Sequence, residues 1–260
     1  MTIAVDHRSH HAGATDRGRL AALIGLGGEV AVYAILLATL LYAIGFIGGV
    51  FVSKRVDTGT IWPPFVAFCI DIQLLLLFAA QYGCMAQPGF RRLLTGYVSP
   101  RGERCVYLLS TSVTLMLLFA AWQPLPALLW RSANLQIAAA LAALSCAGWL
   151  IALYSLALAG HFELFGIRRV LLSFAGRTEA TVPFRAPGLY NVVRHPVYLG
   201  LMIAIWIGPV MTAGHLLFAG MMTVTMLAAI CWEERAQTAL FGDRYRQYQQ
   251  RVPMLIPQVL

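Results

Sequence analysis

The chain has 260 residues, of which 59% are hydrophobic and 12% charged, and its mean hydropathy is +0.72. Soluble globular domains carry about 25% charged residues, so this composition excludes an ordinary soluble enzyme and favours a protein of the lipid bilayer. The formal net charge of +8 fits the excess of basic residues that membrane proteins keep in cytoplasmic loops, and we expect no nucleic-acid partner.

The N-terminal segment 1–24 lacks the compact apolar core of a signal peptide and is expected to be a mobile tail. Its histidines, His7, His10 and His11, fit such a tail better than a metal site. The five cysteines are scattered, without a Cys-x-x-Cys pair or a His/Cys cluster. We therefore expect neither a disulfide framework nor a bound metal. Residues 25–260 are expected to form a single transmembrane domain.

Four apolar runs follow the tail, at roughly 27–51, 61–82, 105–122 and 135–159. Each is close to the length of about 20 residues that one membrane-spanning helix needs. A fifth region, 197–232, has 36 residues and no Asp, Glu, Lys or Arg, which is far too long for one ordinary span. Three residues that favour a turn interrupt it near the middle, namely Gly208, Pro209 and Gly214. The region is therefore either one long tilted helix or a tight helical hairpin.

The distribution of basic residues favours the hairpin. With a hairpin, both termini lie on one side, which then carries sixteen of the nineteen Lys and Arg residues. The other side holds only Lys54, Arg55 and Arg131. The positive-inside rule predicts such a split for a protein with cytoplasmic termini. A single span would instead place the C-terminal arginines outside.

The C-terminal segment 233–260 mixes charged residues with leucine, phenylalanine and tyrosine. This pattern predicts a helix that is broken near Gly242, ends at Pro253 and lies against the cytoplasmic face. The fold class expected for the whole chain is an all-α polytopic membrane protein. It has about six spanning helices, of which the fifth and sixth form a hairpin, and a cytoplasmic C-terminal helical segment.

The segment RHPVYLG at 194–200 places polar residues at the start of a very apolar helix. Pro196 suits the first helical turn, where its missing N–H costs nothing. Arg194 and His195 then lie at the membrane interface, beside free backbone N–H groups that favour a carboxylate or phosphate. A purely structural reading is also open, in which Arg194 anchors the helix at the lipid headgroups and His195 caps it.

A second polar cluster, Glu233, Glu234 and Arg235, ends the other helix of the hairpin. Because the outer ends of a hairpin are adjacent, this cluster should face the Arg-His pair. Tyr245 and Tyr248 are three residues apart and can share one helix face that covers the gap. The result would be a pocket with acidic, basic and aromatic walls, suited to a zwitterionic ligand that contains a base. An ion pair of the Arg194–Glu233 type could occur in the same arrangement.

These segments, RHPVYLG, EER and FGDRYRQYQQRVPMLIP, resemble the isoprenylcysteine carboxyl methyltransferase-like superfamily of integral membrane methyltransferases. The resemblance covers roughly residues 188–257 and implies binding of S-adenosylmethionine by the half of the chain at about 160–260. The cofactor-binding residues that it implies are Tyr190, Arg194, His195, Tyr198, Gly200, Glu233, Glu234, Arg235, Tyr245 and Tyr248.

Upstream segments narrow the resemblance to the bacterial methanethiol S-methyltransferases, a branch of that superfamily. They lie at 71–92, 103–109, 160–170 and 211–219. This resemblance implies a multi-pass protein of the bacterial inner membrane that methylates methanethiol, a small thiol, to dimethyl sulfide. One departure is visible, because the branch has a Gln-His-Ser segment where this chain reads Gln81-Tyr82-Gly83.

The thiol holds its proton above neutral pH, so a proton acceptor is expected beside it. Charges inside membranes are costly, which makes Asp71 in the second span a candidate. His161 and Glu163, which open the long loop after the fourth span, are the other two candidates. Asp71 pairing with a neighbouring helix to hold the bundle, and His161 and Glu163 as ordinary interface residues, are equally open interpretations.

Three other functions compete with thiol methylation. The acceptor could be another lipophilic molecule, such as an isoprenylcysteine carboxylate. The protein could be an NADPH-dependent membrane reductase, in which Arg194 meets a phosphate, although the chain is short for that larger fold. It could also be a non-enzymatic membrane accessory protein. The sequence leaves the oligomeric state and the route of substrate entry open.

Overall fold

The computed structural model describes residues 9–98, 100–158 and 186–257, and most of them are helical. Two short strands pair antiparallel, β1 (Leu128–Arg131) and β2 (Val210–Thr212). The helices, in chain order, are α1 (Ser9–Gly48), α2 (Pro64–Ala86), α3 (Pro88–Thr95), α4 (Pro100–Ala121), α5 (Leu135–Leu156), the 3-10 turn η2 (Gly188–Asn191), α8 (Pro196–Trp206), α9 (Ala213–Phe241) and α10 (Asp243–Arg251).

Five of the helices are long and apolar enough to cross a membrane. The apolar parts have at least 20 residues each, which corresponds to about 30 Å of helix, the thickness of the hydrocarbon core. Large apolar side chains on their outer faces are exposed, as lipid-facing residues must be, for example Leu37, Leu76, Leu117 and Leu150. The prediction of an all-α polytopic membrane protein is confirmed. The spans are Gly27–Gly48, Pro64–Met85, Gly102–Ala121, Leu135–Leu156 and Ala213–Phe241.

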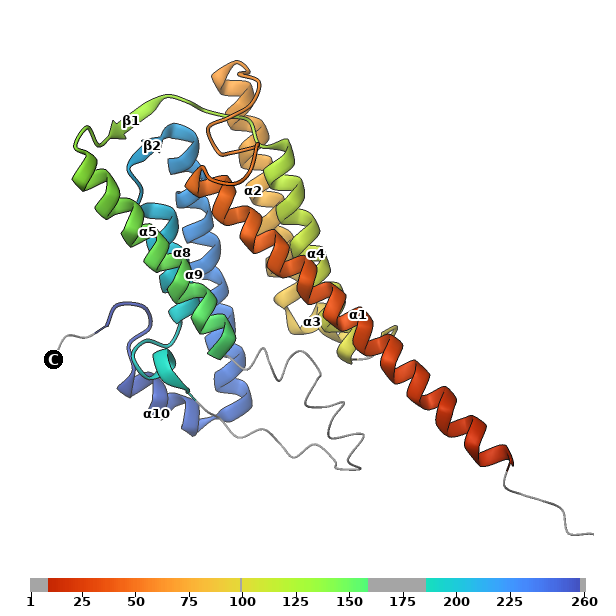
Figure 1. The fold of residues 1–260 in the computed structure, drawn as a ribbon. Helices are drawn as coiled ribbons and strands as arrows, with labels where there is room; N and C mark the ends of the chain where they lie inside the picture. The colour runs from red at the N-terminus through yellow and green to blue at the C-terminus, as the bar shows by residue number, and fades with distance from the viewer. Residues whose placement is uncertain (1–8, 99, 159–185, 258–260) are drawn as a thin grey trace, which may run out of the picture.

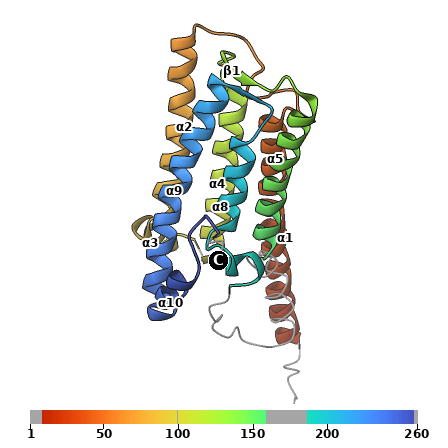
Figure 2. The same cartoon turned by 90° about the vertical axis from the view of Figure 1, so that its left-hand side faces the viewer.

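The fifth of the six expected spans is a short helix. α8 has only 11 residues, and at 1.5 Å per residue it rises by roughly 16 Å, about half of the hydrocarbon core. The chain then runs extended through Gly208 and Pro209 into β2 before α9 begins. α8 and α9 lie side by side and run in opposite directions (Figures 1 and 2), so the predicted hairpin is confirmed with one arm shorter than expected.

The bundle has two unlike ends (Figures 1 and 2). One end carries β1, β2 and the connection from α1 to α2, and we call it the strand end. The opposite end carries α3, η2 and α10, and we call it the α10 end. Lys54, Arg55 and Arg131 all lie at the strand end, as the hairpin topology requires.

Helices also form near both ends of the described chain. α1 begins at Ser9, so residues 9–24 of the expected N-terminal tail are helical. At the other end, α9 stops at Phe241 and Gly242 adopts a positive φ of 58°, which glycine tolerates without strain. α10 follows and stops before Val252 and Pro253. The predicted break at Gly242 is confirmed.

Close backbone packing joins α5 to α8. Gly148 and Gly200 face each other, and a Cβ atom on Gly200 would lie 2.5 Å from the backbone nitrogen of Ala152. The hydroxyl of Ser145 donates to the carbonyl of Ala204 at 2.8 Å across the same contact. Small residues allow such an approach in membranes, where dispersion and hydrogen bonds rather than the hydrophobic effect hold helices together. This contact fixes α8, and with it the polar residues at its start.

Candidate functional site

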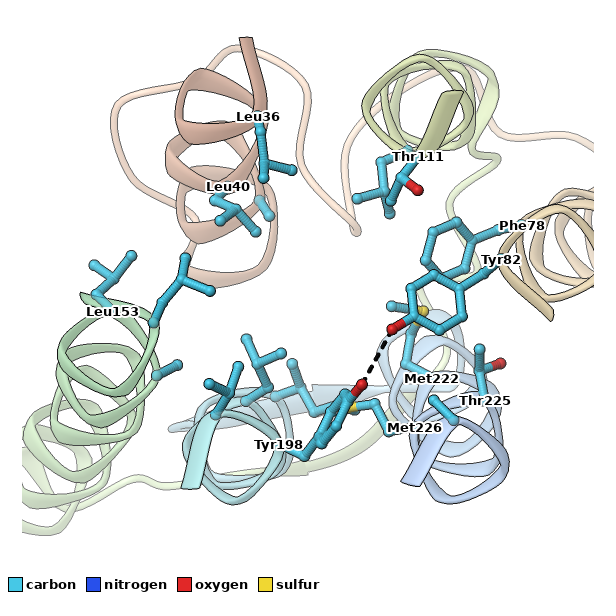
Figure 3. A pocket seen from close by; sticks show the side chains of 18 of the residues that line it. Leu36, Leu40, Phe78, Tyr82, Thr111, Leu153, Tyr198, Met222, Thr225 and Met226 are labelled. Atoms are coloured by element: carbon cyan, nitrogen blue, oxygen red, sulfur yellow. Dashed lines mark hydrogen bonds between the residues drawn. The ribbon is translucent and has the colours of Figure 1, made fainter. Parts of the chain in front are cut away.

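A cavity of about 560 Å³ lies inside the bundle (Figure 3). Six α-helices line it, namely α1, α2, α4, α5, α8 and α9, together with the 3-10 turn η2. Most of the lining side chains are apolar, as Leu36, Leu153 and Met222 are (Figure 3). Polar groups gather at the α10 end of the cavity, where α4 and α8 begin and α2 and α9 end. These polar lining residues are Tyr82, Arg104, Tyr107, Tyr190, His195, Tyr198 and Glu233.

Arg194 does not line this cavity but fastens the C-terminal segment to the bundle. Its Nε donates to Oε1 of Glu234 at 2.7 Å. Its Nη1 donates to the carbonyls of Gln249 and Val252, each at 2.8 Å. The backbone N–H groups of Arg194 and His195 donate to the carbonyls of residues 253 and 254. The ion-pair partner is therefore Glu234, one residue away from the pair that the sequence suggested.

His195 is buried at the start of α8, with 8% of its surface exposed. Its Nε2 lies 3.1 Å from Oε1 of Glu234, and because a carboxylate only accepts, Nε2 carries the hydrogen. Burial lowers the pKa of His195, against the opposing effect of the Glu234 hydrogen bond, so the ring is neutral at pH 7. Nδ1 is then an unprotonated nitrogen, 3.7 Å from Oε2 of Glu233. His195 is the N-cap residue of α8, as the capping interpretation expects, but its side chain makes no capping hydrogen bond.

Glu234 is the centre of this polar network. Its two oxygens accept hydrogen bonds from Arg194 Nε, from His195 Nε2 and from Gln249 Nε2 of α10, the last at 3.0 Å. The ion pair between Arg194 and Glu234 is largely buried, because the relative exposures of the two side chains are 12% and 17%. A carboxylate with three donors is held in one orientation, so the network fixes α8, α9 and α10 relative to one another.

Glu233 points to the cavity side of the same helix end. The hydroxyl of Tyr198 donates to its Oε1 at 2.5 Å. The hydroxyls of Tyr198 and Tyr82 share a hydrogen bond at 3.1 Å across the cavity (Figure 3). Half of the Glu233 side chain is exposed, with a relative exposure of 47%. The carboxylate therefore joins the cavity to the outside of the bundle.

Three tyrosines close the α10 end. The hydroxyl of Tyr248 donates to the carbonyl of Tyr190 at 2.5 Å, and the ring centroids of Tyr245 and Tyr248 lie 5.7 Å apart. Burial raises the pKa of Tyr190 and of Tyr248 to about 12, and it also raises the pKa of Tyr245. All three hydroxyls stay protonated at neutral pH, and those of Tyr190 and Tyr248 donate to backbone carbonyls. Of the three, Tyr190 lines the cavity, while Tyr245 and Tyr248 pack behind it.

Two of the expected cofactor residues belong neither to the cavity lining nor to the polar network around Glu234. Gly200 is on the face of α8 that packs against α5, where it is needed for the close approach already described, and it does not line the cavity. Arg235 is exposed on α9 and does not line the cavity either.

The three candidate proton acceptors lie apart from the cavity or outside the described residues. Asp71 is fully buried in α2, near the strand end, and its Oδ1 accepts from the backbone N–H of Gln123 at 2.8 Å, just after α4 ends. Its Oδ2 has no hydrogen-bond partner among the described residues. This contact ties α2 to α4, as the bundle-holding interpretation predicts. His161 and Glu163 lie outside the described residues.

Sequence reasoning missed three of the polar lining residues, namely Tyr82, Arg104 and Tyr107. A charged residue at the very start of an apolar run was a usable signal for Arg104, because intramembrane charges are usually functional. Tyr82 is the middle residue of Gln81-Tyr82-Gly83, the segment that departs from the expected Gln-His-Ser. Its ring packs against Tyr107, with centroids 5.7 Å apart, which only the packing of α2 against α4 reveals.

Comparison with known proteins shows which proteins this chain is similar to in sequence. The chain is 44% identical over 255 residues to methanethiol S-methyltransferase 1 of Bradyrhizobium diazoefficiens, which covers 97% of this chain and 89% of that protein. It is 43% identical over 225 residues to a methanethiol S-methyltransferase of Mycobacterium tuberculosis, covering 86% and 92%.

A more distant similarity joins the chain to Nurim of Xenopus laevis, at 31% identity over 58% of this chain and 55% of that protein. No family model matches the chain, and no solved structure matches it either. The identity to the two bacterial proteins extends over nearly the full length of all three chains. The chain therefore belongs to the methanethiol S-methyltransferase family.

Proposed function

We propose that the protein transfers the methyl group of S-adenosylmethionine to methanethiol and so forms dimethyl sulfide. The observation that carries this proposal is the 44% identity, over almost the whole chain, to a protein named methanethiol S-methyltransferase. The cavity supports it, because a polar end suits a charged methyl donor and an apolar interior suits a small lipophilic thiol.

The residues at the polar end fit the groups of S-adenosylmethionine. The carboxylate of Glu233 suits ribose hydroxyls or an ammonium group, and the guanidinium of Arg104 suits a carboxylate. The tyrosine rings suit stacking and a positively charged sulfonium. Within the proposed site, Tyr190, His195, Tyr198 and Glu233 contact the donor. The supporting residues hold α8, α9 and α10 in place, and they are Arg194, Gly200, Glu234, Tyr245 and Tyr248. Arg235, exposed on α9, stays a predicted donor-binding residue.

The protein's own contribution is alignment and exclusion of water. S-adenosylmethionine supplies an activated methyl group, and the chain must hold the thiol sulfur in line with it. Apolar side chains of α1, α2, α4 and α5 surround the interior of the cavity (Figure 3). A dry site strengthens the attraction between a thiolate and a sulfonium.

We place the α10 end on the cytoplasmic side of the bacterial inner membrane, with both termini there. Among the Lys and Arg residues that the structure describes, only Lys54, Arg55 and Arg131 belong to the strand end. The other described basic residues belong to the opposite side, which the positive-inside rule assigns to the cytoplasm. The methyl donor would then reach the site from the cytosol.

The test is methyl transfer by the purified protein in lipid nanodiscs. With S-adenosylmethionine labelled in its methyl group and methanethiol as acceptor, we expect labelled dimethyl sulfide in the headspace. A thiol panel, together with an isoprenylcysteine analogue, reports the alternative in which the acceptor is a larger lipophilic molecule. Calorimetric binding of NADPH without binding of S-adenosylmethionine would overturn the proposal in favour of a reductase. Binding of neither would favour a non-enzymatic role.

A further inference from the structure

A continuous chain of three hydrogen-bonding groups leads from the cavity to its polar rim. It begins at the hydroxyl of Tyr82 on α2, continues through the hydroxyl of Tyr198 on α8 and ends at the carboxylate of Glu233 on α9. The two links measure 3.1 Å and 2.5 Å between oxygen atoms. Three separate helices therefore contribute one group each, and all three groups line the cavity. Figure 3 shows the first link, between Tyr82 and Tyr198.

The carboxylate sets the direction of this chain. Glu233 only accepts, so the single hydrogen of the Tyr198 hydroxyl is committed to it. The Tyr82 hydroxyl must then donate to the oxygen of Tyr198. The Tyr198 oxygen has one lone pair left, which can accept a hydrogen from a third group in the cavity. Tyr82 therefore holds the orientation of Tyr198, and Tyr198 connects the cavity to Glu233.

Glu233 offers a way out for a proton. Its side chain is 47% exposed, whereas His195 beside it is 8% exposed. The unprotonated Nδ1 of His195 lies 3.7 Å from its second oxygen. Among the described residues, the titratable or charged groups that face Glu233 or share its end of the cavity are Tyr82, Arg104, Tyr107, Tyr190, His195, Tyr198 and Glu234. Asp71, the expected proton acceptor that the structure describes, does not line the cavity.

We propose that Tyr198 passes the proton of the acceptor thiol to Glu233, which releases it to water, with Tyr82 as a positioning residue. This inference rests on the proposed thiol methylation. The thiol S–H bond breaks as its hydrogen moves to the Tyr198 oxygen, and the Tyr198 hydrogen moves to Glu233. The thiolate sulfur forms the new bond to the methyl carbon, and the carbon–sulfonium bond breaks with its electron pair returning to that sulfur. No oxidant or reductant is needed.

The test compares wild type with Tyr198→Phe and Glu233→Gln in the methanethiol assay at a series of pH values. Removing a general base costs about 100-fold or more in rate, and we expect such a loss for both variants at pH 7. Below the pKa of the thiol, the thiolate fraction in solution rises about tenfold per pH unit. The ratio of wild-type to variant turnover should therefore shrink steadily towards pH 9.5, because the substrate then arrives already ionised.

Controls separate this role from folding and from donor binding. Tyr154→Phe removes a hydroxyl from an exposed tyrosine of α5 that lies outside the cavity, and it should match wild type at every pH. Calorimetry should find S-adenosylmethionine bound to Tyr198→Phe within about threefold of wild type, because phenylalanine keeps the aromatic ring that contacts the donor and loses only the hydroxyl. A turnover ratio that stays constant with pH, or a loss of turnover in Tyr198→Phe matched by its loss of donor affinity, would overturn the proposed proton transfer. Absence of methyl transfer by wild type would instead overturn the proposed function itself.

Discussion

Each end of the bundle contains a carboxylate within the helix packing, and the two carboxylates differ in exposure and in what surrounds them. At the strand end, Asp71 is fully buried and bonds a backbone N–H of the segment after α4. At the α10 end, Glu233 lines a cavity, bonds a tyrosine hydroxyl and is half exposed. A buried carboxylate that accepts from a backbone N–H, as Asp71 does, stabilises the fold. A carboxylate that lines a cavity and is also half exposed, as Glu233 is, can exchange protons during turnover.

The same contrast extends to the neighbours of each carboxylate. The strand end is fixed by contacts with backbone groups, such as Lys54 Nζ to the carbonyl of Trp122 at 2.7 Å and Trp122 Nε1 to the carbonyl of Val56 at 3.0 Å. The α10 end also uses backbone carbonyls, but its centre is a set of contacts between side chains around Glu234. Side-chain networks of this kind are expected at sites of chemistry.

The largest expected effect is at the pair that holds the α10 end together. Arg194→Ala leaves Glu234 without its charged partner, and removal of one member of a buried pair costs roughly 3–5 kcal/mol. We expect a lower midpoint of thermal unfolding and an affinity for S-adenosylmethionine reduced by more than tenfold. Arg246→Ala is the matched control, because its pair with Asp243 is exposed at 66% and 85%. Equal losses of stability and of donor affinity in the two variants would contradict the role of the Arg194–Glu234 pair in holding the α10 end together.

A smaller effect is expected where α8 packs on α5. Gly200→Ala would place a Cβ atom 2.5 Å from the backbone nitrogen of Ala152 and 2.6 Å from the carbonyl oxygen of Gly148, and neither atom can move alone. Overpacking of this kind costs about 1–3 kcal/mol. Thermal unfolding in detergent measures it, with Gly220→Ala on α9 as control, because no atom lies within 4 Å of that added Cβ. Unchanged stability of the Gly200 variant would show that α5 and α8 separate freely.

The smallest effect is expected for Asp71→Asn. The amide oxygen of asparagine can still accept from the backbone N–H of Gln123, so stability should fall by about 1 kcal/mol or less. Turnover of methanethiol should stay within about threefold of wild type, far above that of Glu233→Gln. A hundredfold loss of turnover with intact donor binding would return Asp71 to the role of proton acceptor and break the contrast between the two ends.

Sequence periodicity and charge were sufficient for the architecture. The four apolar runs predict α1, α2, α4 and α5 because crossing the membrane requires a long uncharged helix, and this requirement is visible in any sequence. Gly208 and Pro209 mark the hairpin turn, since neither continues a helix well. The short length of α8 could not be predicted, because it depends on pairing of β2 with β1 from a distant part of the chain.

The site was predictable as a set of segments but not as a set of contacts. Glu233 and Glu234 are adjacent on a helix, so they point about 100° apart, and only the packed structure shows that Glu234 meets Arg194 while Glu233 meets Tyr198. Gly200 is part of the recognisable motif, yet its place is against α5. The hydroxyl of Tyr82 reaches Tyr198 across 116 positions of sequence, which no local pattern encodes.

Hydrogen–deuterium exchange with and without S-adenosylmethionine tests most directly whether the methyl donor binds at the α10 end. We expect donor-dependent slowing of exchange in residues 188–198 and 243–254, which contain η2, the start of α8 and α10. Residues 55–60 and 122–131 at the strand end should exchange equally with and without the donor. Protection confined to the strand end, with none at η2 and α10, would contradict the assignment of the donor site.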